Sequence, residues 1–186
     1  MNRKQPTWYL ALIALLTIGL DQFTKQLVVS TLRPGESWMP LDWLAPIVTV
    51  THVHNTGAAF GIFPAGGQVF TVLGVIVTGA IIYYFHQLPP GEWLARSALG
   101  LQLGGAVGNL IDRFRQGYVT DFINFKFWPV FNVADSSIVV GVAILLIVIL
   151  LEERQEARSR AEESALSPDI DGDIVGGLEP TDSTAP

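Results

Sequence analysis

The chain has 186 residues, of which 49% are hydrophobic and only 15% are charged, and it contains no cysteine. A soluble domain usually carries about 25% charged residues, so this composition indicates a membrane protein. The absence of cysteine excludes disulfides, thiolate catalysis and cysteine-bound metals. The net charge of −6 belongs to the C-terminal end, because residues 152–186 hold ten acidic and three basic residues. The rest of the chain is therefore close to neutral.

Four segments are apolar and long enough to cross a bilayer, which takes about 20 residues. They are residues 8–29, 68–85, 93–111 and 133–151. Arg3 and Lys4 precede the first segment as in a secretory signal, but no small-residue cleavage site follows, so we expect it to be retained. With four spans, both termini lie on the same side of the membrane. That side has six Lys and Arg residues and the other side has five, which favours termini in the cytoplasm.

The segments between and after the spans differ in their predicted structure. Residues 30–67 are long, and the alternating β-branched run 47–53 predicts a strand in a small sheet at the membrane surface. Residues 112–132 lie on the same side. The acidic tail, 154–186, lacks aromatic residues, which predicts disorder. Within the third span, Gly100, Gly104 and Gly108 recur every four residues, a pattern typical of closely packed membrane helices.

Ionisable residues in and beside the spans are the first candidates for function, because burying a charge in a bilayer is costly. Asp21 and Lys25 are one helical turn apart. They form either a local ion pair that reaches the interface or part of a polar cluster. Asn109, Asp112 and Arg113 share one helix face, and a carboxylate beside a guanidinium stays ionised. We therefore expect Asp112 to be a structural anchor.

Two further acids, Asp121 and Asp135, lie among apolar residues at the same predicted membrane depth. Singly, Asp121 has the features of a turn aspartate and Asp135 those of a first-turn helix acid. Together in a low-dielectric site they would share a proton, so that one could activate a water and the other could protonate a leaving nitrogen. His52 and His54 could bind a metal, but no HExxH-like spacing supports that use, and we predict no metal site.

The acids leave three functions open at this point. The first is a protease that uses Asp121 and Asp135. The second is an ion-coupled carrier, which usually shows internal repeats and acids near the midplane, whereas this chain has no repeat and its acids cluster toward one face. The third is a membrane scaffold that packs through its glycines.

Four motifs in order resemble the lipoprotein signal peptidases, the signal peptidase II family of aspartic membrane proteases. They are "DQFTKQLV" from Asp21, "NTGAAFGIF" from Asn55, "GNLIDRFRQGYVTDFINF" from Gly108 and "FNVADSS" from Phe131. The resemblance covers about residues 8–153. The chain departs from the family in its short interval of 14 positions between Asp121 and Asp135 and in its acidic tail.

The resemblance implies an all-α membrane protein with four transmembrane helices and a small periplasmic β-cradle at about 30–67, to which the composition adds a disordered acidic tail. It implies cleavage of the signal peptide from diacylglyceryl-modified prolipoproteins, N-terminal to the lipidated cysteine, with sensitivity to globomycin. The catalytic pair is then Asp121 and Asp135. The implied supporting residues are Asp21, Asn55, Asn109, Asp112, Arg113 and Asn132.

The resemblance also implies a setting. We expect a monomer in the bacterial cytoplasmic (inner) membrane, with cytoplasmic termini and an extracytoplasmic active site. Its partners are the lipid-modified prolipoprotein and membrane lipids, with no nucleic acid, and no metal or organic cofactor is expected.

Overall fold

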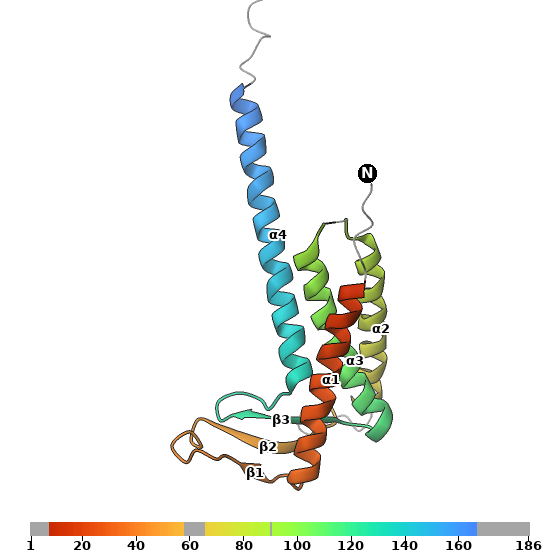
Figure 1. The fold of residues 1–186 in the computed structure, drawn as a ribbon, viewed down its shortest axis with the longest axis vertical. Helices are drawn as coiled ribbons and strands as arrows, with labels where there is room; N and C mark the ends of the chain where they lie inside the picture. The colour runs from red at the N-terminus through yellow and green to blue at the C-terminus, as the bar shows by residue number, and fades with distance from the viewer. Residues whose placement is uncertain (1–7, 58–65, 90, 167–186) are drawn as a thin grey trace, which may run out of the picture. The chain divides into compact units, whose positions relative to one another are not determined.

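The computed structural model describes residues 8–57, 66–89 and 91–166 of the chain. In these residues helices and short strands follow one another in a mixed order (Figure 1). The elements are α1 (Trp8–Thr31), β1 (Ser37–Trp38), β2 (Val48–Asn55), α2 (Gly66–Gln87), α3 (Trp93–Gln116), β3 (Val119–Phe125) and α4 (Val133–Leu166). Each predicted span falls within one helix, and each helix extends beyond its predicted span at one end or both.

Three of the described helices are long and apolar enough to cross a membrane, namely α1, α2 and α4. Their outer faces carry large apolar side chains such as Leu15, Val72 and Ile147, each more than half exposed, as lipid-facing residues are. By the same criterion α3 is not apolar enough, although it was predicted as a span. The reason is that α3 packs between its neighbours and buries twelve of its residues, including small and polar ones.

The face of α3 that meets α1 is built from glycine, as the four-residue repeat predicted. Gly100, Gly104 and Gly108 all approach side chains or backbone of α1. A Cβ added at Gly104 would lie 2.5 Å from the Cβ of Thr17 and 2.8 Å from the carbonyl oxygen of Ala14. No larger residue fits there without moving a helix, so the glycines set the distance between α1 and α3.

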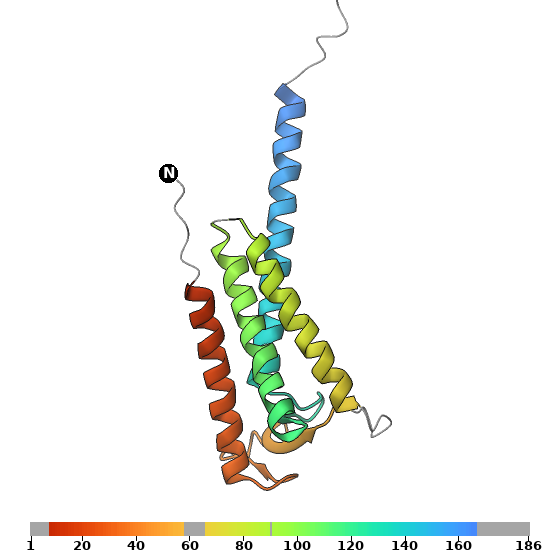
Figure 2. The same ribbon diagram turned by 90° about the vertical axis from the view of Figure 1, so that its right-hand side faces the viewer.

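A neighbouring face of α3 meets the first half of α4 in the same way. A Cβ added at Gly141 would lie 2.7 Å from the carbonyl oxygen of Ala98, and one at Gly105 would collide with the carbonyl oxygen of Ala134. The pairing of an early residue of α3 with a later residue of α4 shows that the two helices run antiparallel. Figure 2 shows α1, α2 and α3 rising from the end of the bundle that carries the sheet.

The small sheet has the order β1-β2-β3, with both pairs antiparallel. The predicted strand at 47–53 is confirmed as β2, which runs two residues further. In the register Trp38 faces Val50 and Val53 faces Asp121, with a bulge between Val50 and Val53. The predicted cradle at 30–67 was incomplete, because β3 comes from the segment between α3 and α4. The sheet lies where α1 ends and α4 begins, away from the α2–α3 connection (Figure 1).

The predicted disordered tail begins too early. The chain divides into two compact units, Met1–Val148 and Ile149–Pro186, and α4 continues in the second unit to Leu166. Residues 154–166 are therefore helical, with alternating charges that form an ion pair of 3.3 Å between Arg160 and Glu156. Helix-spaced pairs of this kind allow a polar segment to stay helical in water. Residues 167–186 lie outside the described part of the chain.

We predict that Gly104→Ala destabilises the protein by about 1–3 kcal/mol, because the added methyl overpacks the contact between α1 and α3. The matched control is Gly79→Ala in α2, where an added Cβ meets nothing within 4 Å. That change removes a helix-weakening glycine and should be neutral or slightly stabilising. Thermal unfolding in detergent would compare the two variants, and equal melting temperatures would contradict the proposed role of Gly104.

Candidate active site

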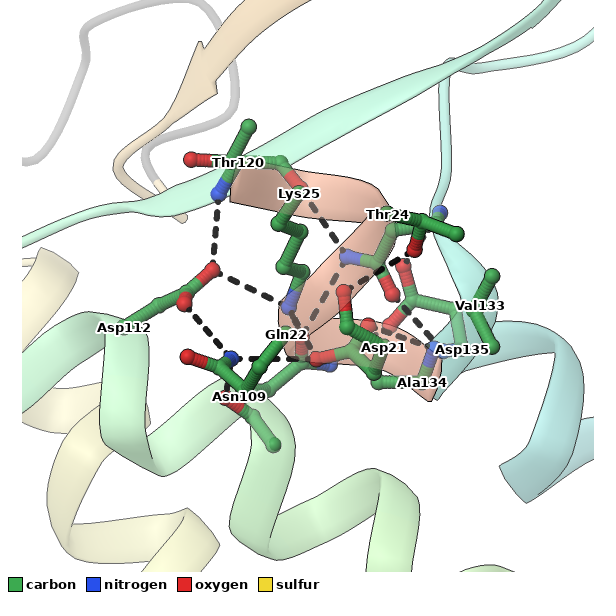
Figure 3. Close-up of polar contacts among 12 residues, drawn as sticks. Asp21, Gln22, Thr24, Lys25, Asn109, Asp112, Thr120, Val133, Ala134 and Asp135 are labelled. Atoms are coloured by element: carbon green, nitrogen blue, oxygen red, sulfur yellow. Dashed lines mark hydrogen bonds and ion pairs between the residues drawn. The ribbon is translucent and has the colours of Figure 1, made fainter. Parts of the chain in front are cut away.

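A cluster of buried polar side chains lies where the helices meet the sheet (Figure 3). Its members come from α1, α3, β3 and the start of α4, and all are at most 7% exposed. They are Asp21, Lys25, Asn109, Asp112, Thr120, Asp121 and Asn132. Buried polar groups are stable only when they are hydrogen-bonded, and buried charges only when they are paired. Every member is hydrogen-bonded, and Lys25 forms ion pairs with both Asp21 and Asp112.

The amino group of Lys25 is the positive centre of the cluster. Its Nζ lies 2.9 Å from Oδ2 of Asp21 and 3.0 Å from Oδ2 of Asp112, and it donates to Oδ1 of Asn109 at 2.9 Å. The predicted pair of Asp21 and Lys25 is therefore confirmed, and it belongs to a polar cluster. The alternative that both side chains reach the interface is wrong, since they are 0% and 3% exposed.

The predicted pairing of Asp112 with Arg113 is wrong. Adjacent residues on a helix point in different directions, so Asp112 turns toward Lys25 of α1. Arg113 donates instead to the carbonyl oxygen of Asn109 at 3.4 Å. It still lies close enough for its charge to interact with those of Asp135, Asp121 and Asp112.

Asp112 is a structural anchor, as predicted, but through other partners. Its Oδ2 accepts the backbone N–H of Thr120 at 3.0 Å, and its Oδ1 accepts from Nε2 of Gln22 at 3.0 Å. The first bond fixes β3 to the end of α3 one residue before Asp121. Gln22 was missed from the sequence, although a polar side chain beside Asp21 in an apolar span was a signal.

Asp21 connects α1 to the start of α4. Its Oδ1 accepts the backbone N–H of Ala134 at 3.0 Å, which is one of the free donors in the first turn of α4. Gly108 makes room for this carboxylate, because a Cβ at that position would lie 2.6 Å from Oδ2 of Asp21. A residue of α1 thus caps α4 immediately before Asp135.

Asp135 has the helix-cap role that its position indicated. Its backbone N–H donates to Oδ1 of Asn132 at 3.0 Å, and its Oδ2 accepts the backbone N–H of Asn132 at 3.2 Å. This reciprocal pair is a capping box. The other oxygen, Oδ1, accepts from Nδ2 of Asn109 at 2.8 Å, which directs the carboxylate toward the buried cluster.

Asp121 lies in strand β3, so the interpretation as a turn aspartate is wrong. Its Oδ1 accepts from Nδ2 of Asn132 at 2.6 Å, and its Oδ2 accepts from Nδ2 of Asn55 at 2.8 Å. Asn132 therefore donates to both carboxylates, to that of Asp121 from its side-chain amide and to that of Asp135 from its backbone N–H. The sequence could not predict this arrangement, since it depends on the register between β2 and β3.

The pKa of Asp121 is raised from its usual 3.8 to about 6. Burial is the main cause, since it penalises the charged carboxylate, and the negative charge of Asp135 acts in the same direction. The hydrogen bonds from Asn55 and Asn132 and the charge of Lys25 oppose the shift. Asp121 thus holds its proton at a pH where an ordinary aspartate has lost it.

The two histidines of β2 are occupied by packing contacts. Nδ1 of His52 lies 2.8 Å from the carbonyl oxygen of Leu32, and the ring of His54 stacks on Tyr118 at 3.9 Å. Among the described residues, no group of three or more His, Asp or Glu side chains is arranged to hold a metal ion.

Comparison with known proteins shows which family this chain resembles in sequence and fold. The family described as signal peptidase (SPase) II matches residues 13–151. A lipoprotein signal peptidase of Moorella thermoacetica is 44% identical over 147 residues, which are 79% of this chain and 96% of that protein. One of Bacillus subtilis (strain 168) is 40% identical over 154 residues, 80% of this chain and 97% of that protein.

A solved structure of a bacterial membrane enzyme has the same fold. It superposes with a TM-score of 0.73 at 32% identity and covers 81% of this chain and 97% of the enzyme. A second such structure gives a TM-score of 0.70, also at 32% identity, over 78% of this chain and 89% of the enzyme. The chain therefore belongs to the signal peptidase II family and is a multi-pass membrane protease.

Proposed function

We propose that this protein is an aspartic endopeptidase that cleaves the signal peptide from diacylglyceryl-modified prolipoproteins, N-terminal to the lipidated cysteine, with a water activated by Asp121 and Asp135. The observation that carries the proposal is the buried position of Asp121, with Asn132 donating to its carboxyl group and to that of Asp135. The names of its relatives support the substrate class.

In this proposal Asp121, whose pKa burial raises to about 6, carries the shared proton, and Asp135 acts as the base. Asp135 takes a proton from a water molecule as the water oxygen attacks the carbonyl carbon of the scissile amide. Asp121 donates its proton to the amide nitrogen as the carbon–nitrogen bond breaks. The products are the free carboxyl end of the signal peptide and the new amino terminus of the lipoprotein, and the dyad regains one shared proton.

The supporting residues have separate tasks in this proposal. Asn55 and Asn132 orient Asp121, and Asn109 orients Asp135. Asp21 and Asp112 position the elements that carry the two acids through backbone N–H groups of α4 and β3. Arg113 contributes positive charge near both acids.

We further propose four membrane spans, with α3 as the third, in the bacterial cytoplasmic membrane. The sheet and the acids then lie at the extracytoplasmic face and the termini in the cytoplasm. The packing of α3 between α1 and α2 supports its membrane depth, since a helix covered by others need not be apolar. The protein works as a monomer on a membrane-held substrate, without nucleic acid.

The decisive test is incubation of the purified protein with a diacylglyceryl-modified prolipoprotein, with and without globomycin. We predict that Asp121→Asn and Asp135→Asn each reduce cleavage by at least 10³-fold, because each removes one half of the acid–base pair. Both variants should remain inserted and folded by thermal unfolding. Normal cleavage by either folded variant would refute the assigned role of that residue.

The pH dependence follows from the proton on Asp121. Because the pKa of Asp121 is about 6, its protonated fraction falls as pH rises through that value. We predict that kcat/KM, which reports the free enzyme, declines above about pH 6 with a slope approaching tenfold per pH unit. If kcat/KM instead rose through the same pH, the result would show that Asp121 is the base and Asp135 the acid.

Asp112→Asn should weaken the fold more than the chemistry. Lys25 keeps Asp21 as a counter-ion, so we expect a loss of about 1–3 kcal/mol, less than for a buried charge left without any partner. Activity should fall in part, because β3 is held less firmly. Thermal unfolding and substrate binding measured beside cleavage would test this. A stable variant that binds substrate and has no activity would move the catalytic role from Asp121 to Asp112.

A further inference from the structure

An apolar hollow lies between the last turns of α1 and the sheet, and the proposed mechanism does not use it. It has a volume of about 510 Å³ and is here called the α1 hollow. Its lining comes from α1, the residue after it and all three strands: Thr24, Leu27, Val28, Thr31, Leu32, Trp38, Val50 and Phe122. None of these residues belongs to the buried polar cluster or to the proposed acid pair. The hollow is therefore a separate feature of the fold.

The α1 hollow lies on the opposite face of β3 from Asp121. Successive side chains of a strand point to opposite faces of a sheet. Phe122 follows Asp121 directly, is 7% exposed and lines the hollow, so it points away from the carboxyl group of Asp121. A ligand in the α1 hollow would therefore lie behind the strand that carries Asp121, and not between the two acids.

The lining of the α1 hollow offers almost no polar partner to a ligand. Oγ1 of Thr24 donates to the carbonyl oxygen of Leu20 at 2.9 Å. Oγ1 of Thr31 donates in the same way to that of Leu27 at 2.7 Å, so both hydroxyls are used within α1. Leu27 is 52% exposed on a helix that is apolar enough to cross a membrane. The hollow thus opens toward lipid and suits an apolar chain.

A charged hollow continues from the apolar one at the end of α1. Its volume is about 610 Å³, and it shares Thr31 and Leu32 with the α1 hollow. Arg33 and Glu36, both exposed, also line it. Trp38, 56% exposed, lies beside it on the apolar side, and tryptophan is typical of the level of lipid headgroups. An apolar and a charged hollow therefore adjoin where a membrane-spanning helix ends (Figure 1).

The charged hollow holds one cation and one anion that are available to a ligand. Among the residues that the structure describes, the ion pairs are those of Lys25 and Arg160, so the guanidinium of Arg33 has no acidic partner. Glu36 accepts the backbone N–H of Arg33 at Oε2, at 2.9 Å, which leaves its Oε1 free. Opposite charges three residues apart match a ligand that itself carries two opposite charges.

The turn that carries these two charges is held firmly against β2. The N–H of Gly35 donates to the carbonyl oxygen of His52 at 2.8 Å, and the N–H of His52 donates to that of Glu36 at 3.0 Å. Nδ1 of His52 also lies 2.8 Å from the carbonyl oxygen of Leu32, and the ring is 3% exposed. Gly35 has a φ of 85°, which glycine adopts readily and other residues do not. The charged hollow is therefore preformed.

We propose that the two hollows together bind one bilayer phospholipid whose headgroup carries an ammonium group. One acyl chain occupies the α1 hollow. The phosphate accepts hydrogen bonds from the guanidinium of Arg33, and the ammonium donates to Oε1 of Glu36. This lipid is distinct from the substrate, because a diacylglyceryl group has neither a phosphate nor an ammonium. Its acyl chain packs on Phe122 and so supports β3 from the face opposite Asp121.

The test titrates the purified, delipidated full-length protein with phosphatidylethanolamine or phosphatidylglycerol of identical acyl chains, and native mass spectrometry counts the bound lipid. We expect the wild type to bind one phosphatidylethanolamine at least tenfold more tightly than phosphatidylglycerol. Arg33→Gln should weaken binding of phosphatidylethanolamine about tenfold, because it removes a charge-assisted hydrogen bond. Glu36→Gln should abolish the preference between the two lipids. Leu27→Trp, which fills the hollow, should weaken binding of both.

Matched controls separate this site from general attraction to lipid. Leu20→Trp adds the same ring to α1 at a position that is 56% exposed and does not line the hollow. Arg115→Gln removes one exposed charge at the sheet end of α3. Both variants should bind lipid as the wild type does. In hydrogen–deuterium exchange, phosphatidylethanolamine should slow exchange of the amides of Val119–Phe125 in the wild type but not in Leu27→Trp.

Four results would overturn the proposal. Equal binding of the two lipids by the wild type, or unchanged binding in Arg33→Gln, would remove the headgroup contacts. Equal losses in Leu27→Trp and Leu20→Trp would show lipid that only surrounds the helices. Displacement of phosphatidylethanolamine by a diacylglyceryl-modified peptide would assign the α1 hollow to the substrate. All positions substituted are exposed, so the variants should fold, and no cleavage is measured, so the outcome does not depend on the proposed function.

Discussion

The structure depends on one buried cation between two buried carboxylates. Lys25 lies 3% exposed between Asp21 and Asp112, and each acid also accepts a backbone N–H from an element that carries a proposed catalytic residue. Without the cation the two acids would repel each other in a medium of low dielectric. With it, α1 and α3 are fixed at a common point, and both β3 and α4 are attached to that point.

This arrangement separates the charged part of the cluster from the reactive part. Amide side chains connect the two, since Asn109 accepts from Lys25 and donates to Asp135. Amide side chains orient carboxylates by hydrogen bonding and carry no net charge. Asp121 is therefore not neutralised by a direct ion pair, and burial can keep its pKa near 6. A lysine in direct contact with Asp121 would lower that pKa and remove the proton that the reaction needs.

The sequence predicted the helices well but not which acid contacts which base. Hydropathy located the spans, and the glycine repeat indicated the contact between α1 and α3, because both are local patterns. The pairing of Asp112 was assigned to its neighbour Arg113, whereas its partner Lys25 is 87 positions away. That contact exists only because Gly104 and Gly108 bring α1 against α3.

The sheet and the end of α4 show two further limits of local patterns. Asp121 reads as a turn residue because a single acid among aromatic residues has no local partner, and only pairing with β2 makes the segment a strand. In the same way, residues 154–166 have the composition of a disordered tail. They are helical because they continue α4 without a break, and the cost of starting a helix has already been met by the membrane span.

The low hydropathy of α3 follows from the chemistry that the fold has to carry out. Hydrolysis needs water and ionisable groups, and in a membrane protein such groups have to be enclosed by protein rather than exposed to lipid. A helix in contact with lipid cannot supply them, but a helix between two others can carry Asn109 and Asp112 on buried faces. Its glycines serve the same end, because close helix contacts leave no space for lipid beside the charged cluster. The least apolar of the four long helices is therefore the one that supplies two buried polar residues of the site.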